Sequence, residues 1–287
     1  MVDITTLAIP AYVVLMVVEA VSFRLLPDEG ERGYAMRDTA TSLAMGLGSV
    51  VAGLGWGALT LTTYLFAQHL TPLRIAPSWW SWAALFVFAD LTYYWQHRAD
   101  HRVRILWASH VNHHSSRRYN LSTALRQSWT GIGTMPLELP MVLLGFPPAM
   151  IFTTMGVNLL YQFWIHTERI DKLARPIEWV LNTPSHHRVH HATNPQYLDK
   201  NYAGVFIVWD RLFGTFEPEV EPVVYGLTTN IDTYNPMRVA FHEYAAIVRD
   251  LRAVRGVRAR LGVLFRTPAW SSATVEAART TLTPAIG

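Results

Sequence analysis

The feature that most constrains the fold of this 287-residue chain is an uncharged, apolar run from Thr39 to Leu73. A helix needs about 20 apolar residues to cross a hydrocarbon core of about 30 Å, so this run suffices for one crossing. Composition agrees, because 16% of the residues are charged and 51% are hydrophobic, whereas average soluble domains are about a quarter charged. The sequence therefore predicts an all-α integral membrane protein.

Three further apolar stretches, at residues 7–23, 75–95 and 139–165, add candidate membrane helices. The last contains GFPP at 145–148, and proline interrupts helical hydrogen bonding. We therefore expect two short helices there, about 131–145 and 148–165, which form a hairpin and return the chain to the side it came from. The predicted architecture is a bundle of about four to five membrane helices with a histidine-rich helical cap.

We expect residues 1–266 to form one membrane-embedded domain, with a catalytic core at about 80–220 and a loosely ordered tail at 267–287. Within that domain, residues 239–265 read as a basic amphipathic helix that lies on an anionic membrane surface. No cleaved signal peptide is expected, because the chain begins MVDITTL, without a basic segment.

Positive charge predicts which side the cap faces. Residues 96–130 contain six arginines against a single acid, Asp100. Because cytoplasmic loops of membrane proteins are enriched in lysine and arginine, this segment is expected in the cytoplasm, and the hairpin places residues 166–191 on the same side. A bacterial inner membrane is the expected location.

Ten of the twelve histidines fall into three short motifs and one single position, and only His69 and His242 lie outside. Residues 97–101 read HRADH, whereas 110–114 (HVNHH) and 187–191 (HRVHH) share the spacing H-x-x-H-H, and His186 directly precedes the last motif. Positions i, i+3 and i+4 share one face of a helix, so each triplet is expected to point three nitrogens at a common point. His166 follows the predicted hairpin.

So many imidazoles predict a dinuclear metal site. Zinc takes about four ligands, whereas nine or ten histidines fill two coordination spheres, and iron suits nitrogen ligation for oxygen chemistry. The sequence has no cysteine and no E-x-x-H pair, which excludes thiolate-ligated sites and the usual carboxylate-bridged di-iron motif. Candidates to hydrogen-bond the ligand rings are His186, Asp90, Asp100 and Glu168. His186 is ambiguous, because it lies about 100° around the helix from His187.

Together these motifs resemble the fatty acid hydroxylase and sterol desaturase superfamily, most closely its alkylglycerol monooxygenase-like bacterial branch. The resemblance covers about residues 80–220 and is carried by four segments: DLTYYWQHRADH, WASHVNHHSSRRYNLSTALRQSW, NLLYQFWIHTERI and NTPSHHRVHHATNPQYLDKNYAGVFIVWDRLFGTF.

The resemblance implies a membrane enzyme that uses two iron ions and O2 to hydroxylate or desaturate a C–H bond of an ether lipid, fatty acyl chain or sterol. It also implies an external electron donor, either tetrahydrobiopterin or a cytochrome b5-like or ferredoxin-type protein. Zinc can occupy such a site in purified samples. Where some relatives carry a tenth histidine, this chain has Gln162. No catalytic residue is expected beyond the metal ligands, which the resemblance places at His97, His101, His110, His113, His114, His166, His187, His190 and His191.

A different class of function remains open. A membrane metal transporter or metal-binding protein would also concentrate histidines, although transport sites lie near the bilayer midplane and these motifs lie among arginines that repel cations. Lipid oxidation and metal flux distinguish the two classes.

Overall fold

The structure is a computed structural model, which describes residues 4–28, 30–131, 133–271 and 273–274. The described residues form helices and connecting segments, with one isolated bridge between Ala192 and Tyr225 and no strand. The prediction of an all-α fold is therefore confirmed for this part of the chain. The helices are α1 (Ile4–Leu7), α2 (Ile9–Leu25), α3 (Met36–His69), α4 (Trp79–Arg102), α5 (Arg104–His114), η1 (Thr123–Leu125), α6 (Thr134–Leu143), α7 (Pro148–Trp164), α8 (Arg175–Val180), α9 (Pro184–His190), η2 (Pro195–Tyr197), α10 (Val208–Leu212), α11 (Pro236–Ala253) and α12 (Val257–Phe265).

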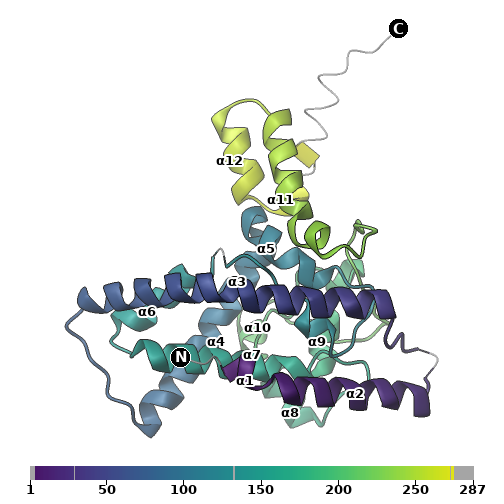
Figure 1. Ribbon diagram of the computed structural model, residues 1–287, viewed down its shortest axis with the longest axis horizontal. Coiled ribbons are helices and arrows are strands. Elements are labelled where there is room, and N and C mark those ends of the chain that lie inside the picture. Colours follow the sequence, from purple (N-terminus) through teal and green to yellow (C-terminus); the bar gives the residue numbers. More distant parts are fainter. Residues whose placement is uncertain (1–3, 29, 132, 272, 275–287) are drawn as a thin grey trace.

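Helix α3 dominates the molecule and extends along its full length in Figure 1. Among the described residues it is the one helix long and apolar enough to cross a membrane by itself, and little of it is buried inside the protein. Large side chains such as Leu47 and Leu54 are about three-quarters exposed, as expected of a surface that faces lipid. Because α2 and α7 have 17 residues each, the number of membrane crossings stays a prediction.

The proline-interrupted hairpin is present as α6 and α7. Helix α6 ends before Gly145, which adopts a left-handed φ of 97°, and α7 begins at Pro148, a residue suited to the first turn of a helix. The Ile75 N–H donates to the Gly145 carbonyl oxygen at 2.9 Å, so the tip of the hairpin lies beside the loop between α3 and α4. An apolar core that includes Tyr64, Leu85 and Met141 fills this end of the molecule.

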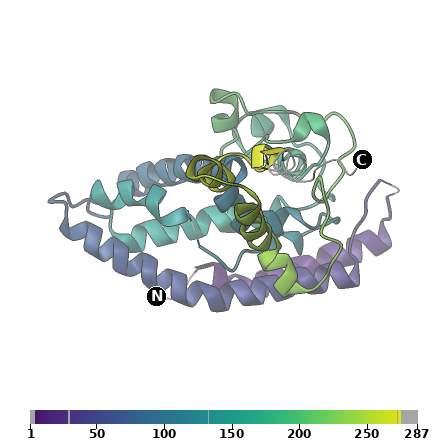
Figure 2. The ribbon, with the colours of Figure 1, turned by 90° about the horizontal axis from the view of Figure 1, so that it is seen from above.

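Helices α4 and α7 run from that end toward α5 and α9, where the histidine motifs lie (Figures 1 and 2). A capping box at Ser78 and Ser81 starts α4, and α4 packs against both α5 and α7. The chain turns at Val103 between α4 and α5. Residues 97–114 and 166–191 therefore meet at one end of the helical body, away from the hairpin tip.

The C-terminal part differs from the single helix expected at 239–265. Two helices, α11 and α12, are separated at Gly256, whose φ of 85° cannot continue a helix. They stand out from the body across the direction of α3 (Figure 1), and α11 packs on α5 through Arg104, which pairs with Glu243 and Asp250.

The start of the expected loose tail is packed. Ser271 is fully buried and its Oγ donates to the Val263 carbonyl oxygen. Residues 275–287 lie outside the described residues. The domain boundary at 266 stays a prediction.

Candidate metal centre

Nine histidines converge in the interior in two adjoining groups. In each group every ring contributes one nitrogen atom, and these nitrogen atoms all lie within 4.8 Å of one another. Both groups combine residues from distant parts of the chain. The first group, cluster A, is His97, His101, His110, His114 and His190; the second, cluster B, is His113, His166, His187 and His191.

Each H-x-x-H-H motif is divided between the two clusters. From α5, His110 and His114 join cluster A while His113 joins cluster B; from α9 and its C-cap, His190 joins cluster A while His187 and His191 join cluster B. The expectation that each triplet points at a single point is therefore wrong. The i, i+4 pair shares one line along the helix, whereas i+3 lies on the other side of that line and reaches the neighbouring cluster.

The clusters adjoin through these helices. The rings of His114 and His191 stack with centroids 4.4 Å apart, and the parallel rings of His187 and His190 lie 5.1 Å apart. The short spacing of the motifs thus holds two nitrogen-rich centres side by side.

Backbone carbonyl groups orient three of the rings. The Nδ1 atoms of His97, His166 and His190 lie 2.8, 2.7 and 3.0 Å from the carbonyl oxygens of Tyr202, Gln162 and Lys200 respectively. A carbonyl oxygen only accepts, so each Nδ1 carries the proton and each Nε2 keeps its lone pair. These three lone pairs are directed into the clusters.

Burial keeps the rings uncharged. It lowers the pKa of His110, His114 and His190 in cluster A well below the usual range, and neighbouring rings lower it further. Burial likewise lowers the pKa of His166 in cluster B to about 4. Neutral imidazole is the form that binds metal ions.

The donor set fits a pair of metal ions. Within the described residues, the buried Nε2 atoms of His101 and His190 have no hydrogen-bond partner. Other Nε2 atoms face one another, as in His97 and His110 at 2.9 Å. Buried nitrogen atoms are rarely left in such an arrangement, and a metal ion in each cluster would satisfy them together.

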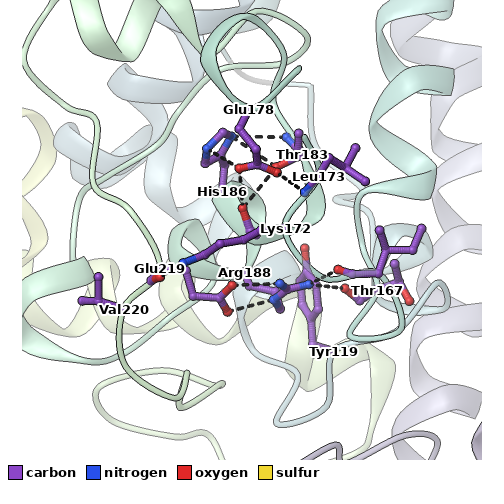
Figure 3. A network of polar contacts seen from close by, with 12 residues as sticks. Tyr119, Thr167, Lys172, Leu173, Glu178, Thr183, His186, Arg188, Glu219 and Val220 are labelled. Carbon is purple, nitrogen blue, oxygen red and sulfur yellow. Dashed lines mark hydrogen bonds and ion pairs between the residues drawn. The ribbon is translucent and has the colours of Figure 1, made fainter. Parts of the chain in front are cut away.

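His186 lies apart from both clusters and bonds to an acid (Figure 3). Its Nε2 is 3.0 Å from Glu178 Oε2, and its Nδ1 is 3.3 Å from Thr183 Oγ1. This arrangement anchors the start of α9 to α8.

The predicted acids have other partners. Asp90 accepts hydrogen bonds from the N–H groups of Val205 and Phe206 and from the side chains of Asn158 and Trp209.

Glu168 accepts from the Arg32 N–H. Asp100 is buried, and its Oδ1 has no hydrogen-bond partner among the described residues. The Gln162 side chain bonds to Tyr93 and Asn158, so it is held away from the role of a tenth ligand.

Sequence reasoning missed Asp199, whose Oδ1 lies 3.8 Å from His101 Nδ1. Asp199 has a positive φ of 59° and belongs to the loop that also supplies the carbonyl groups of Lys200 and Tyr202. No local motif marks such a loop, because two of its three contributions come from the backbone.

Arg188, inside the HRVHH motif, ties the two segments of cluster B together (Figure 3). Its guanidinium group donates to both carboxylate oxygens of Glu219 at 2.8 Å. It also donates to the carbonyl oxygens of Thr167 and Ile170, at 3.1 and 2.7 Å. The segment after His166 is thereby held against α9.

A cavity of about 1090 Å³ extends from cluster A toward α11. His101, His114 and His190 form part of its wall, together with Trp107 of α5. His242, which the sequence left outside the metal set, also lines this cavity.

Comparison with known proteins places this geometry in context. The family model described as fatty acid hydroxylase matches residues 82–215, a range that contains both clusters. Human alkylglycerol monooxygenase is 44% identical over 270 residues, which cover 93% of this chain and 60% of the human protein. The Xenopus tropicalis protein of the same name is 44% identical over 244 residues, covering 83% of this chain and 54% of the relative.

A more distant relative is the ornithine lipid hydroxylase of Rhizobium tropici, 28% identical over 138 residues, which cover 47% of this chain and 41% of that protein. The chain thus spans between about two-fifths and three-fifths of the length of these relatives. No solved structure gives a significant match.

Proposed function

The chain belongs to the fatty acid hydroxylase superfamily, and from that premise we propose that it is a membrane-bound, O2-dependent lipid monooxygenase in which clusters A and B each hold an iron ion. The proposed reaction is hydroxylation of a lipid C–H bond, and the alternative reaction at the same site is desaturation. Four relatives are named alkylglycerol monooxygenase, which favours an ether lipid as substrate.

The observation that carries this proposal is the convergence of nine buried imidazoles into groups of five and four. The protonation of three of these rings supports it, because the Nδ1–H groups of His97, His166 and His190 donate to backbone carbonyl oxygens and leave Nε2 lone pairs for metal. Iron with mainly imidazole ligands would supply the activation of O2. The ligands are proposed to be the nine histidines of clusters A and B, with His186 excluded.

The remaining chemistry rests on the residues of this chain. The rings of clusters A and B are buried or nearly so, which limits the contact of bulk water with the reacting centre. Arg188 and the loop at 199–202 hold the rings in place, so little rearrangement accompanies the reaction. The cavity along α11 gives a lipid access to cluster A.

Monooxygenation consumes one O2, two electrons and two protons for each hydroxyl group formed, and it releases one water. The chain has no cysteine for an iron–sulfur centre, so the two electrons are proposed to come from an external donor. The candidates remain tetrahydrobiopterin and a cytochrome b5-like or ferredoxin-type protein.

We place the enzyme in a membrane through α3, with the clusters on the cytoplasmic side. The excess of arginine over acid at 96–130 supports this orientation. The relatives above 40% identity are animal proteins, so the comparisons do not support the expected bacterial inner membrane.

The test is to supply purified, iron-loaded protein with a 1-O-alkylglycerol, a reductant and 18O2, and to analyse the lipid by mass spectrometry. The proposal predicts O2 consumption and lipid that has gained one labelled oxygen or lost two hydrogens, together with aldehyde if an ether carbon is oxidised. Metal flux into proteoliposomes, with no consumption of O2, would instead identify a transporter.

A further inference from the structure

The cavity beside cluster A lies between a wall that includes histidines of cluster A and a face of α11 that carries two arginines. Arg238, His242 and Arg249 of α11 all line it. Arg238 and Arg249 are 11 positions apart, close to three turns, so they lie on one side of the helix about 16 Å apart. The cavity therefore presents a cation near each end of this side.

The charges along the cavity do not balance. Arg102 pairs with Asp199 at 3.1 Å, Arg104 pairs with Glu243 at 2.7 Å, and Asp232 pairs with Arg117 outside the cavity. Once these pairs are set aside, two cavity-lining charges remain. Both are arginines, Arg238 and Arg249, and neither forms an ion pair anywhere in the described part of the chain.

The same cavity has substantial apolar wall. Trp107 and Val111 contribute from α5, and Met237 and Phe241 contribute from α11. Phe241 and Met237 are 39% and 58% exposed, so these side chains are available to a ligand. A cavity with unpaired cations and apolar walls suits an amphiphile with an anionic group.

His242 adds a polar contact. Its Nδ1 lies 2.9 Å from the Val239 carbonyl oxygen, so the neutral ring carries its proton there and keeps a lone pair on Nε2. That nitrogen can accept a hydrogen bond from a hydroxyl group, such as one on a glycerol backbone.

We propose that this cavity binds the phosphate of a single-chain lipid, recognised by Arg238 or Arg249, with the chain against the apolar wall. Lipid phosphates would then be the preferred substrates. This second statement rests on the proposed function, whereas binding itself does not. The separation of the two arginines means that one phosphate contacts one of them.

The experiment measures binding to the full chain in detergent, without O2 or reductant, by displacement of a radiolabelled 1-O-hexadecylglycerol 3-phosphate. The competitors are the same unlabelled lipid phosphate, neutral 1-O-hexadecylglycerol and inorganic phosphate. The variants are Arg238→Gln and Arg249→Gln. Arg252→Gln is the matched control, because Arg252 is exposed on the same helix but does not line the cavity.

The lipid phosphate is expected to bind at least about tenfold more tightly than either the neutral lipid or inorganic phosphate, because one lacks the charge and the other lacks the chain. One of the two cavity variants should lose at least about tenfold in affinity for the lipid phosphate and little for the neutral lipid. Arg252→Gln should match the wild type.

Equal affinity for charged and neutral lipids would overturn the proposal, as would inorganic phosphate binding as tightly as the lipid. Unchanged binding in both cavity variants, or an equal loss in Arg252→Gln, would do the same. Selective binding, with no oxidation of either the neutral lipid or the lipid phosphate in the 18O2 assay, would leave the site in place and reject the proposed function instead.

Discussion

The Nε2 atoms of His166 and His187 lie 3.0 Å apart although 21 positions separate the residues in the chain. Because the Nδ1 proton of His166 is directed to the Gln162 carbonyl oxygen, the His166 Nε2 lone pair faces the second ring. Two segments are thus brought together around a point where nitrogen lone pairs gather. This contact joins α9 to the segment that follows α7 within cluster B.

Removing the metal should destabilise the protein. A ligand that binds only the folded state adds about 4 kcal/mol when its free concentration is a thousandfold above its Kd. Treatment with a chelator should therefore lower the midpoint of thermal unfolding in detergent, and adding back Fe²⁺ under anaerobic conditions should restore it. A midpoint that is indifferent to both treatments would argue against bound metal in the folded protein.

Arg188→Ala should be strongly destabilising. The change leaves the Glu219 carboxylate without its bidentate partner at a site where the arginine side chain is 8% exposed, and breaking a buried pair costs about 3 kcal/mol or more. Arg117→Ala is the control, since both partners in its pair with Asp232 are at least half exposed and such pairs contribute about 1 kcal/mol or less. Denaturant unfolding measures both variants, and comparable losses would contradict the anchoring role of Arg188.

The Glu178 carboxylate should stabilise the protein in a defined range of pH. Burial would raise its pKa, but hydrogen bonds led by that from His186 outweigh burial and lower the pKa from 4.5 to about 2. A carboxyl group with a depressed pKa stabilises the folded state above 4.5, and this contribution is lost as the pH falls toward about 2.

Thermal unfolding of the wild type and Glu178→Gln at pH 6 and pH 3 tests this sign. At pH 6 the wild type should unfold at a higher temperature than Glu178→Gln. At pH 3 this difference between the two unfolding temperatures should be smaller. A gap that widens in acid would show that the Glu178 pKa is not depressed.

Asp90→Asn should lower stability and leave the metal content unchanged. The Asp90 carboxylate accepts four hydrogen bonds, three of them from Val205, Phe206 and Trp209. An amide has one accepting oxygen, so donors are left unpaired at a cost of about 1–3 kcal/mol each. If the variant instead loses metal while its unfolding curve is unchanged, Asp90 acts on a ligand ring, as the sequence suggested.

The grouping of histidines followed from sequence because helical periodicity and the proline-interrupted hairpin both act locally. The turn at Gly145 and Pro148 brings α7 back toward α4, and this explains how His166 reaches cluster B. By contrast, the division of each H-x-x-H-H motif between two centres depends on how α5 packs against α9. Spacing alone does not specify that packing.

The contributions of the loop at 199–202 were not predictable for a related reason. The contacts of Asp199 with His101 and of the Lys200 carbonyl oxygen with His190 join residues that are distant in the sequence or involve backbone atoms, which carry no residue-type signal. The break at Gly256 did have a local signal, since glycine commonly ends helices. The basic amphipathic pattern continues on both sides of Gly256, and for this reason residues 239–265 were expected to form a single helix.

The most direct test of the central claim is the iron content per chain of protein that has been loaded with iron under anaerobic conditions, measured by elemental mass spectrometry. The wild type is compared with His113→Ala, His190→Ala and the control His69→Ala. We predict about two iron ions in the wild type and in His69→Ala, and a clear loss in the other two variants, one from each cluster. One ion or fewer in the wild type, or two ions retained in both cluster variants, would contradict a dinuclear centre built from these histidines.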